Sequence, residues 1–383
     1  SVGVGWAAGR VVAGYDGPGS VIIRTAVRRA GDVTAAAGDA AADAPWLMAA
    51  AAGGSEDMVA GAAVTGLVGS PMGLLALVTM GPGALSGSRE VMLRGLLRHG
   101  PRVGVVDDGG GGRAVALPAA LRPDGRAARP PRGLGDLAAS MDDVGALSTV
   151  PRQAQRDPWR ARVRVSRVQQ PAGGDAWVVV IPGTQTWAPT GGANPSDLTS
   201  NLALLSDSTA SAEGALVQAA TDAMTQAGIA PGDPVLVAGH SQGGIAAAVL
   251  ATRADSPFTI THVYTEGSPI ADLDVPDSVS VLAVEHSGDL VPNLDDGPGT
   301  NPDTATWTTV TAPVPTAAQV TVPDEASLAA PLLAHESRKY QHTAAALDRS
   351  DHPSVVAWRD SAAVFFAGRG QVSEYRMERV PDE

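Results

Sequence analysis

The second half of the chain contains short apolar runs that recur at regular intervals. Arg162–Val168 places apolar side chains at alternating positions, which predicts an edge or antiparallel strand. Ala176–Ile181 is continuously apolar, as is typical of a strand covered on both faces. Three further strands are predicted by the apolar runs at Val235–Ala238, Ile260–Tyr264 and Ser280–Val284.

Helical periodicity fills the gaps between these runs. Within Ser211–Ala227 the apolar residues recur every three or four positions, and Gly228 follows as a helix end. Ile245–Ala254 predicts a second helix. Because strands alternate with helices, the pattern predicts an α/β fold with a mostly parallel sheet and helices on both faces.

The first half has a different pattern. Residues 25–52 are Ala-rich with scattered charges, which predicts short helices that need a partner to pack on. Asp107–Gly112 and Arg113–Arg132 form a Gly/Pro/Arg-rich segment typical of a linker or long loop. We therefore expect a helical N-terminal region over residues 1–160 and a catalytic domain over residues 161–383.

One uncharged stretch raises the question of a membrane. Met58–Ser88 carries no charged residue, but Pro71 and Pro82 interrupt it, which favours buried or inter-helical packing over membrane contact. No cleavable secretory signal is visible near the start of the sequence. These features favour a cytoplasmic or membrane-associated protein over a secreted one, with membrane contact through residues 58–88 as an open alternative.

Composition removes several function classes. The chain is 44% hydrophobic and 17% charged, as expected for a folded protein, and it contains no cysteine. Cysteine nucleophiles and thiolate metal sites are thereby excluded. The net charge of −13 arises entirely from residues 161–383, since residues 1–160 are slightly positive. Neither half holds a basic stripe, so nucleic acid is not an expected partner. No His-Glu-x-x-His motif is present, and we expect no metal or cofactor.

The residues Gly239-His240-Ser241-Gln242-Gly243 match the pattern G-x-S-x-G. An apolar strand runs directly into this motif and a helix of small residues leaves it, as in the strand–turn–helix elbow that exposes a nucleophilic serine. The start of the helix also stabilises negative charge that develops beside the serine. Ser241 is therefore the predicted nucleophile.

A serine hydroxyl needs a base, and the base needs a carboxylate to orient it. Asp289 lies in the turn just beyond the predicted strand Ser280–Glu285, where active-site groups collect in open α/β sheets. Asp289 is the predicted acid. Glu266, which ends the preceding strand, is the alternative.

The base is chosen by chain order, which in this elbow family runs serine, acid, histidine. His335 is the predicted base, with His342 and His352 as alternatives. This order excludes the histidines that precede the acid, namely His99, His240, His262 and His286.

Two backbone donors are expected to hold the oxyanion. One is the N–H of Gln242, directly after the serine. The other comes from the loop after the strand Ala176–Ile181, where Thr184 is the first choice and Gln185 the second. Gly183 lets this loop turn close to the substrate.

Four segments together resemble the class 3 (fungal-type) lipase group of α/β-hydrolases. They are Gly183-Thr184, Gly239-His240-Ser241-Gln242-Gly243-Gly244, Thr265-Glu266-Gly267-Ser268-Pro269 and Gly288-Asp289-Leu290-Val291-Pro292. The resemblance covers about residues 160–365. It implies an α/β-hydrolase fold, with Ser241 and Asp289 in a catalytic triad and Thr184 in the oxyanion hole. The family's histidine often has an aromatic residue close behind it, as Tyr340 stands behind His335.

The resemblance has departures and open points. Glu266 replaces the family's usual aromatic residue, and the family's disulfides are absent. Gln185–Ser208 contains Trp187 and several leucines, and is either a lid with an apolar underside or a rigid insertion. Trp187, Gln185 and Leu290 are the expected substrate contacts.

These observations predict a serine hydrolase that cleaves a small-molecule ester or a lipid-like, hydrophobic acyl ester. The same triad in an acyltransferase is one alternative. A non-catalytic binding or scaffold protein that retains the fold is the other.

Overall fold

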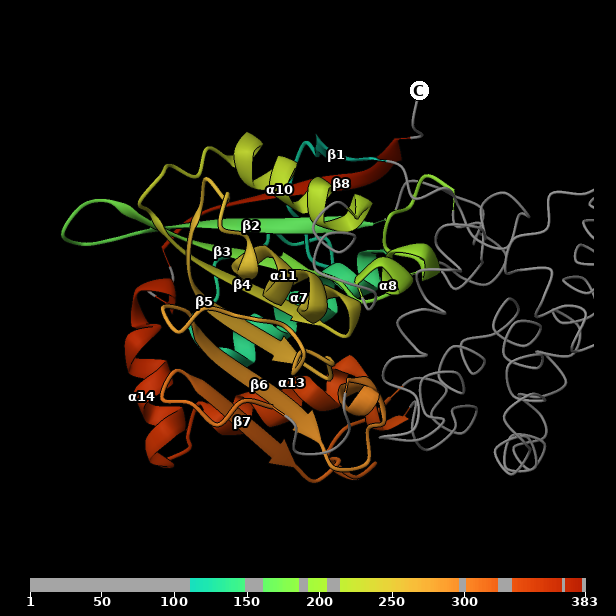
Figure 1. Cartoon of the computed structure of the whole chain (residues 1–383), viewed down its shortest axis with the longest axis vertical. Coiled ribbons are helices and arrows are strands. Elements are labelled where there is room, and N and C mark those ends of the chain that lie inside the picture. Colours follow the sequence, from blue (N-terminus) through green and yellow to red (C-terminus); the bar gives the residue numbers. More distant parts are fainter. Residues whose placement is uncertain are drawn as a thin grey trace, which may run out of the picture.

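The computed structural model describes residues 111–148, 161–185, 192–204, 214–295, 301–322, 333–366 and 369–380. In this part of the chain a mixed sheet of eight strands runs in the order β1-β8-β2-β3-β4-β5-β6-β7 (Figure 1). The α/β class predicted from the sequence is confirmed. The strands are β1 (Gly111–Ala116), β2 (Arg162–Gln169), β3 (Asp175–Ile181), β4 (Pro234–His240), β5 (Thr259–Glu266), β6 (Ser280–His286), β7 (Trp307–Ala312) and β8 (Gly370–Val380).

The sheet has a parallel part and an antiparallel part. Strands β3 to β7 pair in parallel, each with the next. The pairs β1–β8, β8–β2 and β2–β3 are antiparallel. The antiparallel prediction for β2 is therefore confirmed, but its placement at an edge is wrong, because β8 pairs with its outer side.

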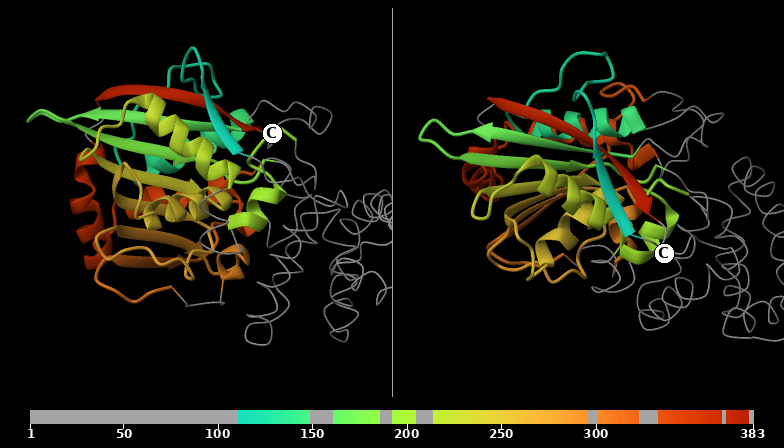
Figure 2. Two further views of the ribbon diagram at one scale, coloured as in Figure 1. Left: turned by 45° about the horizontal axis from the view of Figure 1, so that its top comes forward. Right: turned by 90° about the horizontal axis from the view of Figure 1, so that it is seen from above.

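Helices cover both faces of the sheet (Figure 2). One face carries α10 (Ala215–Ala227) and α11 (Gln242–Thr252), and the other carries α7 (Leu134–Ser148), α13 (Ser337–Leu347) and α14 (Pro353–Ser361). The expected helix end at Gly228 is confirmed, since this glycine is left-handed (φ 83°) and its N–H caps the last turn of α10. A short helix, α8 (Leu198–Leu204), follows β3, and 3₁₀ turns occupy Val291–Leu294 and Ala363–Phe366.

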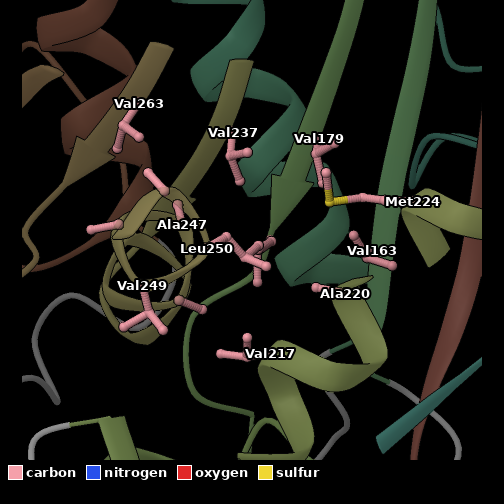
Figure 3. Close-up of a cluster of buried hydrophobic side chains, with 14 of the residues drawn as sticks. Val163, Val179, Val217, Ala220, Met224, Val237, Ala247, Val249, Leu250 and Val263 are labelled. Atoms are coloured by element: carbon pink, nitrogen blue, oxygen red, sulfur yellow. The ribbon is translucent and has the colours of Figure 1, made fainter. Parts of the chain in front are cut away.

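Small aliphatic side chains fill the first face. Val163, Val179, Val237 and Val263 come from four neighbouring strands and pack against α10 and α11 (Figure 3). On the opposite face the buried aromatic side chains gather under α7, α13 and α14; they are Tyr264, Tyr340, Trp358 and Phe365. The first face also buries four aromatic side chains, which are Trp177, Phe258, Trp307 and Tyr375.

The expected boundary near residue 160 does not separate the described elements. Strand β1, inside the segment expected to be a linker, pairs along its whole length with β8. Helix α7 also precedes residue 160, yet it buries Leu134 and Leu137 against the sheet. Residues 25–52 and 58–88 lie outside the described residues, so the helical N-terminal region and its membrane contact stay predictions. Within the described ranges no helix is both long and apolar enough to span a bilayer.

Candidate active site

Four parallel strands end side by side at one edge of the sheet. Neighbouring strands β3, β4, β5 and β6 end at Ile181, His240, Glu266 and His286. The segments that follow these ends hold Gly183 and Thr184, Ser241, Gly267, and Asp289. Residues from four distant parts of the sequence therefore meet at the edge where open α/β sheets place their sites.

Ser241 occupies a strained turn between β4 and α11. Its backbone angles are φ 55° and ψ −125°, and it is the one non-glycine residue of the described chain with positive φ. The Ser241 N–H donates to the Glu266 carbonyl (2.8 Å), and the Ser241 carbonyl accepts from the Ser268 hydroxyl (2.9 Å). Neighbouring structure therefore holds a conformation that costs about 1–3 kcal/mol, as is common at functional sites.

Glycines make this turn possible. A Cβ on Gly239 would lie 2.1 Å from the carbonyl carbon of Gly243, and a Cβ on Gly243 would lie 2.3 Å from the Ile181 carbonyl oxygen. Both clashes are with backbone atoms, which cannot move aside. The glycines of the G-x-S-x-G pattern are therefore required by the close approach of β3, β4 and α11.

Asp289 and His335, the acid and the base predicted from the sequence, are hydrogen-bonded to each other. His335 Nδ1 lies 2.7 Å from Asp289 Oδ2, and the other carboxylate oxygen accepts the Val291 N–H at 2.9 Å. Burial acts to raise the pKa of Asp289, but the charge and hydrogen bond of His335 outweigh it, helped by Val291 and Tyr340, and the pKa falls below its usual value. The carboxylate is therefore ionised and binds the Nδ1–H tautomer, which leaves Nε2 as the basic nitrogen.

Gly267 brings the serine and this pair together. A Cβ on Gly267 would lie 2.9 Å from Asp289 Oδ2 and 3.0 Å from His335 Nδ1. On the other side of this glycine, the Glu266 carbonyl accepts a hydrogen bond from the Ser241 N–H. The Glu266–Gly267 peptide thus lies between the serine turn and the Asp289–His335 pair. Its left-handed conformation (φ 59°) and the lack of space both demand glycine.

The predicted oxyanion donors lie next to Ser241. Gln242 is the first residue of α11, so its N–H has no acceptor within the helix. A Cβ on Gly183 would lie 3.4 Å from Ser241 Cβ, which places the Gly183-Thr184 loop against the predicted nucleophile. The Thr184 hydroxyl accepts a hydrogen bond from Asn201 Nδ2 (3.0 Å).

Residues 192–204 are bound tightly to this region. The buried Gln242 side chain donates to the Asp197 carbonyl (2.8 Å) and lies 3.0 Å from the Ser196 hydroxyl, which donates to it. The Asp197 carboxylate is fully buried and pairs with Arg379 of β8. This part of the segment expected to be a lid or a rigid insertion is therefore anchored to the core.

The other predicted residues divide into three groups. Gln185 is half-buried beside the oxyanion loop and donates to the Gly183 carbonyl (2.8 Å), and Leu290 is 39% exposed next to Asp289. Trp187 lies outside the described residues. The alternative bases do not reach the site, since His342 and His352 are both exposed.

Glu266, the alternative acid, makes a different contact. Its buried carboxyl accepts a hydrogen bond from the Tyr264 hydroxyl at 2.7 Å, whereas His335 is bound by Asp289. Burial raises the pKa of Glu266 to about 8, against a smaller lowering by the Tyr264 hydrogen bond. The structure thus pairs His335 with Asp289 close to the Ser241 turn, and the Glu266 carboxyl is bonded to Tyr264 instead.

Sequence reasoning missed two side chains that support the site. The buried Tyr340 hydroxyl donates to Asp289 Oδ2 (2.7 Å), and its ring stacks on His286 with centroids 3.8 Å apart. His240 Nε2 lies 2.9 Å from the His335 carbonyl oxygen. The aromatic residue behind His335 was a signal for the first. Nothing in the local pattern indicates the second, because a neighbour of the serine need not face the base.

Comparisons with known proteins add no relative: no family model, no curated protein and no solved structure matches this chain. Within the described ranges no group of three or more His, Asp or Glu side chains is arranged to hold a metal ion.

Proposed function

We propose that this protein is a serine hydrolase that cleaves carboxylic esters. The observation that carries the proposal is the convergence of a strained Ser241 and a bonded Asp289–His335 pair on either side of the Glu266–Gly267 peptide. A serine in an ordinary turn needs neither the strain nor an oriented imidazole. The motif resemblance to class 3 lipases and the order of the parallel strands favour an α/β-hydrolase fold.

Acylation follows from the roles of these groups. Ser241 Oγ attacks the ester carbonyl carbon while His335 Nε2 takes its proton, and Asp289 stabilises the imidazolium that forms. The negative charge moves to the carbonyl oxygen, which accepts hydrogen bonds from the Gln242 N–H and from Thr184. The carbon–oxygen bond to the alcohol then breaks, and His335 returns the proton to the leaving alkoxide.

Deacylation repeats the steps with water. His335 removes a proton from a water molecule, which attacks the acyl-enzyme carbonyl. The Ser241–acyl bond breaks, the serine recovers its proton, and the carboxylic acid leaves. An alcohol in place of water would give acyl transfer, so the balance of the two products reports which acceptor the site prefers.

The test is the hydrolysis of p-nitrophenyl esters from short to long acyl chains. We expect the intact protein to be active and Ser241→Ala to lose at least about 10³-fold in kcat. Ser256→Ala is the matched control, because this serine precedes β5 at the opposite edge of the sheet, and it should keep full activity. Labelling of Ser241 by a fluorophosphonate is a second readout. A protein that is neither active nor labelled, or a mutant that keeps the activity, contradicts the proposal.

A further inference from the structure

His240 touches three parts of the site at once. It precedes the predicted nucleophile in the chain, and its Nε2 lies 2.9 Å from the backbone oxygen of His335. A Cβ on Gly183 would lie 3.2 Å from His240 Nδ1, so the other edge of the ring faces the oxyanion loop. The imidazole therefore fills the space between the nucleophile turn, the predicted base and the oxyanion loop.

The contact with His335 fixes the protonation of His240. A carbonyl oxygen only accepts hydrogen bonds, so His240 Nε2 must carry a proton, and in the neutral ring Nδ1 then carries none. Burial, and after it the charge of His335, lower the pKa of His240 to about 3, against smaller raising effects of Asp289 and of the hydrogen bond to the His335 carbonyl. The ring is therefore neutral across the pH range in which a histidine base works.

The rings around His240 restrict its movement. The His240 and His335 rings are 4.6 Å apart, and the Tyr340 ring meets His240 edge to face at 5.7 Å. Tyr340 in turn donates to Asp289. A shift of His240 would thus move the backbone of His335 relative to the serine, whereas the His335 side chain would stay bound to Asp289.

We propose that His240 is a positioning residue, whose Nε2–H holds the His335 backbone so that the imidazole of His335 faces Ser241. This inference rests on the proposed function, since it assigns His335 as the base. It adds a residue that acts through the backbone of His335 and takes no part in the proton transfer itself. Its effect should be on the chemical step rather than on substrate binding, because misplacement of a reacting group by about 1 Å can cost about 10²-fold in rate.

Two substitutions separate the hydrogen bond from the bulk of the ring. His240→Phe keeps a ring but has no donor, and His240→Gln keeps a donor of similar reach. We expect kcat to fall about 10- to 100-fold in His240→Phe with KM within about twofold, and His240→Gln to recover most of the loss. His342→Phe is the control, because His342 is exposed on α13, and it should behave like the intact protein.

These experiments distinguish a failure of the proposed function from a failure of the role inferred for His240. If the intact protein hydrolyses no ester and takes no fluorophosphonate, the proposed function fails. If the intact protein is active and His240→Phe is equally active, the inference fails. It also fails if His240→Phe and His240→Gln lose activity equally and in proportion to the loss of folded protein, because His240 is then only structural.

A measurement on the unsubstituted protein covers the case in which both variants fail to fold. Nitrogen-15 NMR of the ring should show His240 as the neutral Nε2–H tautomer that does not titrate between pH 5 and 8. The Nδ1–H tautomer would overturn the inference whatever the activity, because Nε2 would then have no proton to donate to the His335 carbonyl.

Discussion

At the scale of single residues, the Glu266 carboxyl group lies where burial destabilises its ionised form. It is fully buried, and one oxygen, Oε1, accepts a hydrogen bond from Tyr264. The other oxygen, Oε2, has no hydrogen-bond partner within the described chain. A neutral carboxyl tolerates this better than a charged one, which is why burial raises its pKa to about 8.

This shift predicts how stability depends on pH. Between about pH 4.5 and pH 8 the unfolded chain has lost the Glu266 proton and the folded protein keeps it. Folding then requires proton uptake, so the free energy of unfolding falls as pH rises through this window, by roughly 1.4 kcal/mol per pH unit at most. Glu266→Gln cannot titrate and should lack this part of the slope.

Urea unfolding of both proteins at pH 5 and pH 8.5 measures the effect. At each pH we compare the free energy of unfolding of Glu266→Gln with that of the unsubstituted protein. We expect this difference to shift in favour of Glu266→Gln by a few kcal/mol from pH 5 to pH 8.5. Comparison of the two proteins is needed because Asp295, whose pKa burial raises to about 7, titrates in the same range in both. A constant difference across pH would show that Glu266 is ionised in the folded protein.

The sequence predicted the residues whose roles follow from a local pattern. Ser241 stands in an elbow that only a strand followed by a helix of small residues produces, and Asp289 follows a predicted strand end. His240 and Tyr340 could not be assigned in this way. Their contacts depend on how the chain returns to the site after β7, because Asp289 and His335 are 46 positions apart in the sequence.

At the scale of elements, a buried ion pair joins β8 to the segment ahead of α8, which contacts Gln242 and the Thr184 loop. Arg379 of β8 and Asp197 ahead of α8 are both almost fully buried, and Arg379 Nη2 donates to Asp197 Oδ1 at 2.8 Å. Asp197 Oδ1 also accepts the Ser200 N–H at 2.9 Å, and the Asp197 carbonyl accepts from Gln242. The pair thus connects β8 to the start of α11.

Removing one partner should leave a buried charge without compensation. We expect Arg379→Met to lower the free energy of unfolding by about 3–5 kcal/mol and to reduce kcat, because the segment that contacts the Thr184 loop loosens. Asp197→Asn combined with Arg379→Met should recover part of the stability, since neither charge is then left alone. Denaturant unfolding of the single and double variants tests this. A loss below about 1 kcal/mol in Arg379→Met would mean that the pair is not buried in solution.

The same strand explains which elements the sequence did not predict. The sequence of β8 is rich in charged residues, as is typical of an exposed segment, yet Glu374, Glu378 and Arg379 are buried. Glu374 accepts from the buried Arg164 at 2.6 Å, and Glu378 from Arg113 at 2.7 Å. Paired charges can enter a sheet where unpaired ones cannot, but the pairing is long-range and leaves no periodic signal. The parallel strands β3 to β6 were predictable because their apolar runs need no partner to be recognised.

At the scale of the whole molecule, the elements before residue 160 complete the fold of those after it. Asp348, at the end of α13, accepts hydrogen bonds from the backbone N–H groups of Leu134 and Gly135 at 2.8 and 2.9 Å, and so caps the start of α7. α7 then buries Leu137 and Met141 over the sheet. A chain that begins at residue 161 would lack this helix and also β1, the outer partner of β8.

Two truncations therefore give opposite expectations. Deleting residues 1–160 should expose the face of the sheet that α7 covers and give an aggregating or molten protein. Deleting residues 1–106 retains every described element, and the remaining chain should unfold cooperatively. Leu137→Ala in the full chain is the milder version and should cost about 2–5 kcal/mol. Thermal unfolding and near-UV circular dichroism distinguish these states. Cooperative folding of residues 161–383 alone would show that α7 packs on a domain already complete, and would restore the boundary at residue 160.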